Sequence, residues 1–236
     1  GFKPGRSVQD AMEAVFLGIA KKPKWVLDAY ISKCFDEINH QYILDKCETY
    51  PQMQKQIRDW LKAGILYGGE YAFPKMGRPQ GEIISPLLAT IALHGIREDM
   101  DRYINTLGGH RPKNRQTTTF VRYADDFVIM HPDKQVILQL REVIQKFLKP
   151  IGLKLNPIKT RIVHTLNATE ERLPGFTFLG FDVIQRQKRL RQRAGFTDRD
   201  SKQDYITLIT PSKKGTQAHR LKIREIIRQY GGIDQE

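Results

Sequence analysis

The amino-acid sequence predicts an α+β fold, in which a sheet region passes into a helical one. Three observations predict it: short β-rich runs, amphipathic helical runs between them, and a basic helical run near the end of the chain. The chain has 236 residues, enough for one domain or two small ones. Its 28% of charged residues and 9% of aromatic residues are typical of a globular rather than a disordered protein.

A helix and a strand are predicted at the start of the chain. Ser7 and Asp10 form a capping-box-like helix start, and the apolar residues that follow recur at helical spacing until Lys21-Lys22-Pro23. Residues 25–31 then form a short apolar run that is suited to a buried strand. The sequence therefore predicts a core strand directly after an amphipathic helix.

The middle of the chain is predicted to be a helix, a loop and a hairpin. A Ser-Pro pair, a good N-cap followed by a good first helical residue, predicts a helix over residues 85–103. Residues 108–116, rich in Gly, Pro, Lys and Arg, are predicted to be a loop. The β-rich runs 119–123 and 127–130 flank Ala124-Asp125-Asp126, which predicts a β-hairpin with two carboxylates at its turn.

The last part of the chain combines two helices with short strands. Apolar residues at helical spacing predict an amphipathic helix over residues 136–148. Pro211-Ser212 opens a basic helix whose apolar stripe includes Leu221, Ile226 and Ile227. The strands predicted between these helices are residues 153–155, 161–164, 178–184 and 205–209.

The chain is strongly basic, with a net charge of +13 and a pI near 9.7. Residues 183–229 hold 13 Lys and Arg and four acids, a net +9 in one fifth of the chain. Phe181, Phe196 and Tyr205 lie along the same stretch, where they could support base stacking. Nucleic acid is the favoured partner, because each cation placed on a phosphate releases counterions. A solvated basic face is the plainer alternative.

Several other classes of protein are disfavoured. No apolar run approaches the roughly 20 residues that span a bilayer, and the N-terminus has no signal-peptide core. Cys34 and Cys47 are too few for a disulfide framework or a structural zinc site, which fits a reducing compartment. We therefore expect a soluble, cytoplasmic protein without a membrane partner. The first residues resemble the middle of a domain, so we expect an excerpt of a longer protein.

Asp125 and Asp126 are the strongest chemical feature of the sequence. Adjacent acids repel one another unless a cation offsets their charge, and Mg²⁺ bound by one or two carboxylates and by substrate phosphates would do so. In nucleotidyl transfer two such ions, about 3.5–4 Å apart, hold the attacking and leaving oxygens. An ordinary Asp-rich turn is the alternative. The apolar runs on both sides favour a turn that is anchored in a packed sheet.

The segment Tyr123-Ala124-Asp125-Asp126 resembles the YADD box of reverse transcriptases. Further blocks lie around it in the order that group II intron-encoded reverse transcriptases and maturases use. They are Gly1-Phe2-Lys3-Pro4-Gly5-Arg6-Ser7, Asp36-Glu37-Ile38-Asn39-His40, Pro79-Gln80-Gly81 with Ile84-Ser85-Pro86-Leu87-Leu88-Ala89, Gly152-Leu153-Lys154-Leu155 with Lys159-Thr160, and Phe178-Leu179-Gly180-Phe181. Six ordered blocks cover nearly the whole chain and are far more specific than any one of them.

The resemblance implies a right-hand polymerase palm with partial fingers and the first helix of the thumb. Residues 1–24 and 40–115 would belong to the fingers and the helices between fingers and palm. Residues 25–39 and 116–210 would form the palm sheet and the strands between palm and thumb, and residues 211–236 the start of the thumb, or maturase X domain. The resemblance also implies Mg²⁺ as cofactor and group II intron RNA or an RNA/DNA hybrid as partner. It leaves the oligomeric state open.

The resemblance also implies roles for individual residues. Asp125 and Asp126 would be metal-binding catalytic acids, and Lys159 matches the lysine thought to protonate the pyrophosphate leaving group. Each of the other candidates has a plainer alternative as a core aromatic, a loop residue or a surface charge. The candidates for nucleotide and template binding are Phe35, at the position of the gate against a 2′-hydroxyl, Gln80 and Arg78. The candidates for RNA binding are Lys213, Lys214, Arg220, Lys222 and Arg224.

The sequence departs from the family pattern at the metal site. Motif A of the family reads Asp-Ile-Lys-x-x-Phe-Asp, and here Tyr30 stands at the position of its first, metal-binding Asp. A neutral phenol with a pKa of about 10 is a poor ligand for a hard cation. Asp28 lies on the same strand face but roughly 6.6 Å away, so its use as a ligand needs a bulge or a register shift. In the next motif, Arg78 and Glu82 stand where relatives have a small residue and a glycine.

These departures leave three functions open. The first is a maturase that binds intron RNA and assists splicing, with DNA synthesis weak or absent. The second is an active RNA-directed DNA polymerase that uses Asp125, Asp126 and Asp28, or a water in place of the missing ligand. The third is a general RNA-binding remnant without a splicing partner. Primer extension separates the second from the others, and discrimination between intron RNA and unrelated RNA separates the first from the third.

Overall fold

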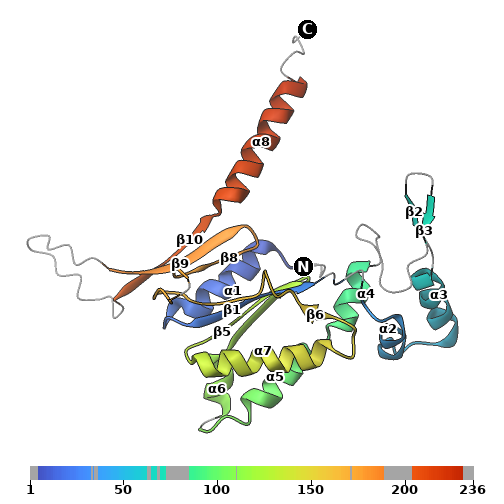
Figure 1. The fold of residues 1–236 in the computed structure, drawn as a ribbon, viewed down its shortest axis with the longest axis horizontal. Coiled ribbons are helices and arrows are strands. Elements are labelled where there is room, and N and C mark those ends of the chain that lie inside the picture. The colour runs from blue at the N-terminus through green and yellow to red at the C-terminus, as the bar shows by residue number, and fades with distance from the viewer. Residues whose placement is uncertain are drawn as a thin grey trace, which may run out of the picture.

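The computed structural model describes residues 5–32, 34, 37–62, 65–67, 70–72, 85–109, 111–170, 172–188 and 204–230. An antiparallel five-stranded sheet lies at the centre of the molecule (Figure 1). Its strands are β1 (Trp25–Ser32), β4 (Thr119–Tyr123), β5 (Asp126–His131), β6 (Lys154–Leu155) and β7 (Arg161–His164). The order is β4-β5-β1-β6, and β7 pairs with the first half of β1 beside β6. Strand β1 is therefore central, and β4 lies at an edge.

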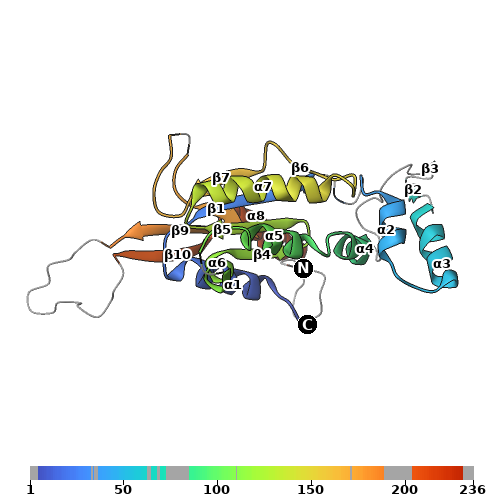
Figure 2. The same ribbon diagram turned by 90° about the horizontal axis from the view of Figure 1, so that it is seen from below.

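Alternate residues of β1 enter two hydrophobic cores. Leu27, Ala29 and Ile31 lie in the larger core with α5 (Ile96–Ile104) and α7 (Lys134–Leu148) on one face of the sheet. Val26 lies in the smaller core on the opposite face, against α1 (Val8–Ala20). Because successive strand residues point to opposite faces, Asp28 and Tyr30 share the face of Val26 and α1. Figure 2 shows α7 and α1 on opposite sides of the sheet.

Further elements lie beside the central sheet. Helices α2 (His40–Lys46), α3 (Pro51–Lys62) and α4 (Ser85–Ala92) and the hairpin of β2 (Ile65–Tyr67) and β3 (Glu70–Ala72) extend to one side (Figure 1). A second antiparallel sheet contains β8 (Phe176–Phe178), β9 (Phe181–Gln187) and β10 (Tyr205–Pro211), and packs onto the α1 face. Helix α8 (Lys213–Tyr230) follows β10 and projects away from the body.

Most local predictions are confirmed. Ser7 caps α1, and its side chain and that of Asp10 form the predicted capping box. The strand predicted over 25–31, the hairpin around the paired acids and the helix over 136–148 are β1, β4–β5 and α7. The predicted strand 178–184 is wrong at its start, where Leu179 and Gly180 have φ values of 49° and 83°. These residues form the turn between β8 and β9.

The single helix predicted over 85–103 is also wrong, because the chain forms two helices there. Gly95, with a φ of 97°, separates α4 from α5. The Nζ of Lys46 on α2 donates to the carbonyl oxygens of Ala92 and His94, which lie at the end of α4 and just after it. These bonds satisfy carbonyls that a helix end leaves open, so the break is stabilised from another element.

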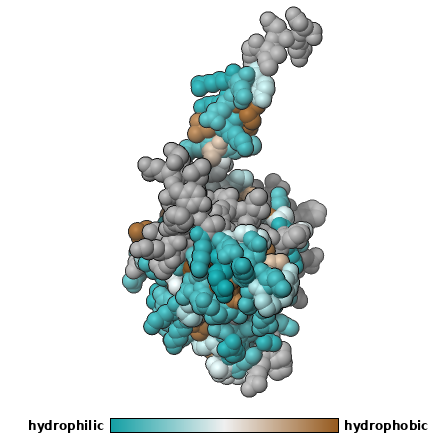
Figure 3. Space-filling model, turned by 90° about the vertical axis from the view of Figure 1, so that its right-hand side faces the viewer, coloured by the Kyte–Doolittle hydropathy of each residue, from teal (hydrophilic) through white to brown (hydrophobic). Residues whose placement is uncertain are grey.

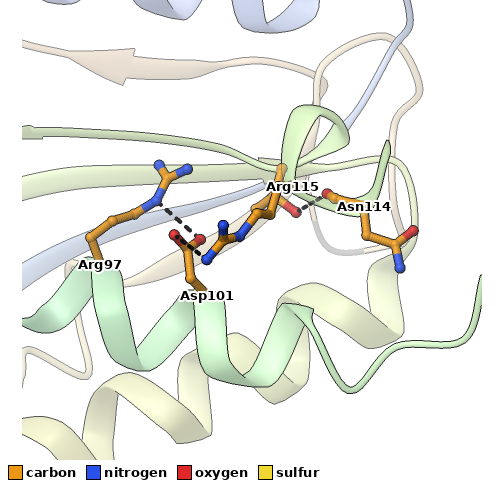
Figure 4. A network of polar contacts seen from close by, with 5 residues as sticks. Arg97, Asp101, Asn114 and Arg115 are labelled. Carbon is orange, nitrogen blue, oxygen red and sulfur yellow. Dashed lines mark hydrogen bonds and ion pairs between the residues drawn. The ribbon is translucent and has the colours of Figure 1, made fainter. Parts of the chain in front are cut away.

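The loop predicted over 108–116 is wrong as well, because residues Arg111–Thr117 form α6. Asp101 of α5 holds this helix through an ion pair with Arg115 at 3.5 Å, and it also pairs with Arg97 at 3.2 Å (Figure 4). The carbonyl oxygen of Asn114 accepts from the backbone N–H of Thr118. Tertiary contacts therefore override the weak helix propensity of this segment.

Candidate functional site

The candidate site lies at the tip of the β4–β5 hairpin. Asp125 lies in the turn, whereas Asp126 is the first residue of β5 and pairs with both Tyr123 and Tyr30. The prediction of two turn carboxylates is therefore correct for Asp125 and off by one position for Asp126. Ala124 has a φ of 58°, in the left-handed region. This conformation is unfavourable for any residue that has a side chain. A tight turn thus presents the two acids at the end of the sheet.

The register of β1 fixes the positions of Asp28 and Tyr30. Tyr30 pairs with Asp126 and Asp28 with Val128, in a ladder that continues without a break to Trp25 and His131. The strand therefore has no bulge that would move Asp28 to the position of Tyr30, which lies directly beside the acidic hairpin. Asp28 stays two residues further down the same face.

Tyr30 is engaged by both the hairpin and Lys159. Burial raises the pKa of this phenol, and the charge of Asp125 and hydrogen bonding to it act in the same direction. The Nζ of Lys159 lies 4.1 Å from the centre of the Tyr30 ring, a cation–π contact. The structure thus brings together Tyr30, Asp125, Asp126 and Lys159, which the sequence separates by up to 129 positions.

Asn156 fixes the segment that carries Lys159. Its backbone N–H donates to the carbonyl oxygen of Tyr30 at 2.8 Å. Its side-chain oxygen accepts from the backbone N–H groups of Ile158 and Lys159, both at 3.0 Å. Because this turn is tied to β1 by a backbone bond, the position of Lys159 depends on the same strand as that of Tyr30.

The acids of the site are held in an unfavourable environment for charge. Burial raises the pKa of Asp28 to about 7, and the Arg161 guanidinium partly opposes this shift. Burial and the neighbouring Asp125 raise the pKa of Asp126 to about 6, against the opposing charge of Lys159. Desolvated carboxyls beside like charges are typical of functional sites.

A pocket of about 340 Å³ adjoins the hairpin. It is lined by Arg6 and Ser7, which precede α1, by Thr90 of α4 and by residues 120–124. Burial lowers the pKa of the Arg122 guanidinium, and the described residues provide it with no hydrogen bond or ion pair. Sequence reasoning missed Arg6, Arg122 and Arg161 as site residues. Arg6 lies within the Gly1–Ser7 block, and Arg122 directly precedes Tyr123 of the YADD box. Their closeness to these motifs could have identified them as candidates.

The remaining candidates fall in two groups. Phe35, Gln80, Arg78 and Glu82 lie outside the described residues. The five RNA-binding candidates are all exposed on α8, which buries none of its side chains. Figure 3 shows α8 extending from the body with apolar patches between hydrophilic ones. The apolar stripe predicted for this helix is present but exposed, with Leu221, Ile226 and Ile227 each about half accessible.

The described residues contain no group of three or more His, Cys, Asp or Glu side chains placed to hold a metal ion. No helix in this part of the chain is both long and apolar enough to cross a membrane.

The fold is that of a right-hand polymerase. A solved structure of apo telomerase from Candida tropicalis, truncated from its C-terminal domain, matches 75% of this chain and 38% of that one, with a TM-score of 0.56 and 15% sequence identity. A second apo structure of the same telomerase gives a TM-score of 0.55 over 75% of this chain and 35% of that one, at 14% identity. The predicted α+β polymerase class is confirmed.

Residues 1–183 match the family described as reverse transcriptase (RNA-dependent DNA polymerase), and the chain belongs to that family. The group II intron-encoded protein LtrA of Lactococcus lactis subsp. cremoris is 25% identical, over 89% of this chain and 43% of that protein. An uncharacterised 91 kDa protein in the cob intron of Schizosaccharomyces pombe is 26% identical, over 96% and 35%. Protein YkfC of Escherichia coli is 28% identical, over 80% and 55%. This chain thus spans about a third to a half of the length of these relatives.

Proposed function

We propose that this chain is the reverse transcriptase core of a group II intron maturase, which binds intron RNA and assists its splicing while DNA synthesis is weak or absent. Intron-encoded relatives support the RNA partner. The arrangement of Tyr30 carries the proposal of impaired synthesis. We assign fingers, palm and thumb to the residue ranges that the resemblance implies, with α8 as the start of the thumb.

The site donors fit a pair of magnesium ions poorly. Mg²⁺ requires nearly octahedral oxygen ligands and is bound through carboxylates. Here Tyr30 supplies a phenol, and burial and the nearby Asp125 raise its pKa, which keeps the phenol neutral. The Lys159 ammonium lies against the same ring and near Asp126, so it offsets part of the negative charge that would attract a cation. The residues of this site therefore do not match the donor set that a magnesium pair needs.

Exposed cations on α8 support the RNA-binding role. Lys213, Lys214, Arg220, Lys222 and Arg224 lie on an isolated helix where none forms an ion pair within the described residues. Their ammonium and guanidinium groups remain free for phosphate oxygens. Phosphate contacts position a nucleic acid without reading its sequence. Selectivity for one intron would then come from RNA shape and from single-stranded segments.

Active DNA synthesis is the second candidate, and Asp28 favours it. This carboxyl lies on the face of Tyr30, and a pKa of about 7 leaves it half ionised near neutral pH. The unbroken β1–β5 register opposes the candidate, because it places Asp28 beside Val128 rather than beside the hairpin turn. A general RNA-binding role without a splicing partner is the third candidate.

Primer extension on an RNA template tests the catalytic part, with the full-length protein and Mg²⁺ or Mn²⁺. We expect no cDNA from the wild type and measurable cDNA from Tyr30→Asp, alone or with Glu82→Gly, because these changes restore a carboxylate and a small loop residue. Tyr30→Phe is the matched control: it removes the bond to Asp125 without adding a ligand, and should stay inactive. Robust cDNA from the wild type would refute the proposed loss of synthesis.

Binding measured at several salt concentrations tests the RNA part. We expect log affinity to fall linearly with log salt, with a slope of about −0.9 per neutralised phosphate on a duplex and about −0.7 on a single strand. Changing the five α8 cations to Gln should weaken binding and reduce the slope. Lys146→Gln with Lys149→Gln, two exposed cations at the end of α7 and just after it, is the control. A flat salt dependence refutes electrostatic binding, and equal affinity for unrelated RNA favours the general RNA binder.

A further inference from the structure

Within the part of the chain that the structure describes, helix α8 is held at its first turn. None of its side chains is buried, and it projects from the body in Figure 1. The buried Ser212 holds the junction: its backbone N–H donates to the carbonyl oxygen of Gly180 at 2.8 Å. Its side-chain oxygen accepts from the backbone N–H of Gly215 at 3.1 Å, as an N-cap does. The direction of α8 is therefore set by the β8–β9–β10 sheet on which it stands.

That sheet meets the central sheet through apolar packing, two backbone hydrogen bonds and a polar side-chain contact. The backbone N–H of Gln185 donates to the carbonyl oxygen of Thr165 at 2.8 Å, and that of Gly175, just before β8, to the carbonyl oxygen of His164 at 2.9 Å. Phe176, Phe178 and Val183 pack into the smaller core with α1 and the central strands. Interdigitated apolar side chains and the two backbone bonds already restrict the angle between the sheets. Hydrogen bonds have narrow angular ranges, and they can fix it.

Gln185 of β9 makes the polar contact, and only 1% of its surface is exposed. Its Nε2 donates to the carbonyl oxygen of Ile19 in α1 at 2.9 Å and to the hydroxyl of Thr207 in β10 at 3.1 Å. Its Oε1 accepts from the hydroxyl of Thr165, just after β7, at 2.5 Å. One amide thus joins β9 to the helix, the central sheet and the strand that leads into α8.

We propose that Gln185 is a positioning residue that sets the direction of α8 relative to the Asp125–Asp126 hairpin. This inference rests on the proposed function, and adds to it that the RNA bound by α8 also contacts the palm. A fixed direction raises the effective concentration of α8 at RNA that is already bound to the palm. A freely swinging α8 would keep its cations but lose this advantage.

Distance measurement between two spin labels tests the inference without RNA. The labels are attached at Gln145→Cys on α7 and Gln217→Cys on α8, both exposed, while the buried Cys34 and Cys47 react slowly. We expect Gln185→Leu, which keeps the size and removes the amide, to broaden the distance distribution. Gln187→Leu, at the exposed end of the same strand, should leave it unchanged. Ile104→Val in α5 controls for stability, because a general loss of stability should not move α8.

RNA affinity provides the second readout. We expect Gln185→Leu to weaken binding about tenfold, less than the roughly 10²–10⁴-fold gain that linking two sites can give, because α8 stays covalently attached. A narrow, wild-type distribution in Gln185→Leu would overturn the inference. If that variant does not fold, Thr165→Val removes the hydroxyl that joins Gln185 to the end of β7 and should broaden the distribution; no broadening there overturns the inference equally. Failure of the α8 cation variants to change RNA binding would refute the proposed function and leave the distance result standing.

Discussion

The two ends of β1 differ in whether buried polar groups have hydrogen-bond partners. At the Trp25 end, the hydroxyl of Thr165 accepts from the backbone N–H of Lys24 at 3.0 Å and donates to Gln185. Burial lowers the pKa of Lys24 to about 8, but its ammonium donates to the carbonyl oxygen of Thr117 at 2.6 Å and to the hydroxyl of Thr119 at 3.3 Å. At the Tyr30 end, Asp28 and Asp126 are partly desolvated close to a further carboxylate, and burial raises the pKa of both.

This difference separates a structural network from a functional site. Fully bonded buried groups fix one arrangement of the elements that they join. Acids with raised pKa values and like-charged neighbours store electrostatic energy that a ligand or a substituted side chain can relieve. In this chain Lys159, which lies against the Tyr30 ring, offsets part of the negative charge of Asp126.

The largest effect is expected from breaking the satisfied end. Thr165→Val removes one hydroxyl and leaves the Lys24 N–H and the Gln185 Oε1 without that partner in a fully buried position. A buried polar group without a partner costs about 1–3 kcal/mol, so we expect the free energy of unfolding to fall by about 2–4 kcal/mol. Urea denaturation measures it. A loss below that of an exposed Thr-to-Val change would show that water enters this end.

A smaller and pH-dependent effect is expected at the acidic end. Asp28 has a pKa near 4 in the unfolded chain and about 7 in the folded one, so the folded state binds more protons between these pH values. Its contribution to stability is therefore present at pH 4 and is lost as the pH rises to 7. Asp28→Asn cannot ionise and should be more stable than the wild type at pH 8, by on the order of 2 kcal/mol.

Unfolding measured between pH 4 and pH 8 checks this prediction. The stability advantage of Asp28→Asn over the wild type should grow with pH and level off above pH 7. The charge of Asp126 is one cause of the raised pKa of Asp28, so Asp28→Asn also removes a repulsion that acts on Asp126, and the advantage includes this relief. If the free energies of unfolding of the two proteins run parallel over the whole pH range, ionisation of Asp28 does not destabilise the folded state.

Local signals in the sequence predict much of the fold. The Ser7 capping box, the apolar run of β1, the helical spacing in α7 and the turn between β4 and β5 each lie within a few residues, and the structure confirms them. Helix α6 was missed because its local propensity is weak, and its contacts with α5, among them the Asp101–Arg115 ion pair, come from outside the segment. The break before α5 was missed because Lys46, far away in the sequence, satisfies the exposed carbonyls.

The candidate site is predictable only in part, for the same reason. Family motifs identify Asp125, Asp126, Lys159 and the unusual Tyr30. The contact of Lys159 with the Tyr30 ring and the burial of Asp28 depend on strand pairing between segments that are distant in the sequence. No spacing pattern encodes such a contact, and the Gln185 network at the other end of β1 is hidden for the same reason.

The smallest effect is expected from the same Thr-to-Val change at Thr160, which follows Lys159 at the acidic end. The Thr160 hydroxyl is buried and has no hydrogen-bond partner among the described residues. Valine matches threonine in shape and removes this unsatisfied group, so Thr160→Val should raise the free energy of unfolding by about 1 kcal/mol. Urea denaturation of both valine variants gives the contrast directly: the same change destabilises one end of β1 and stabilises the other. A loss of stability in Thr160→Val would show that its hydroxyl has a partner, and that the acidic end is as fully bonded as the opposite one.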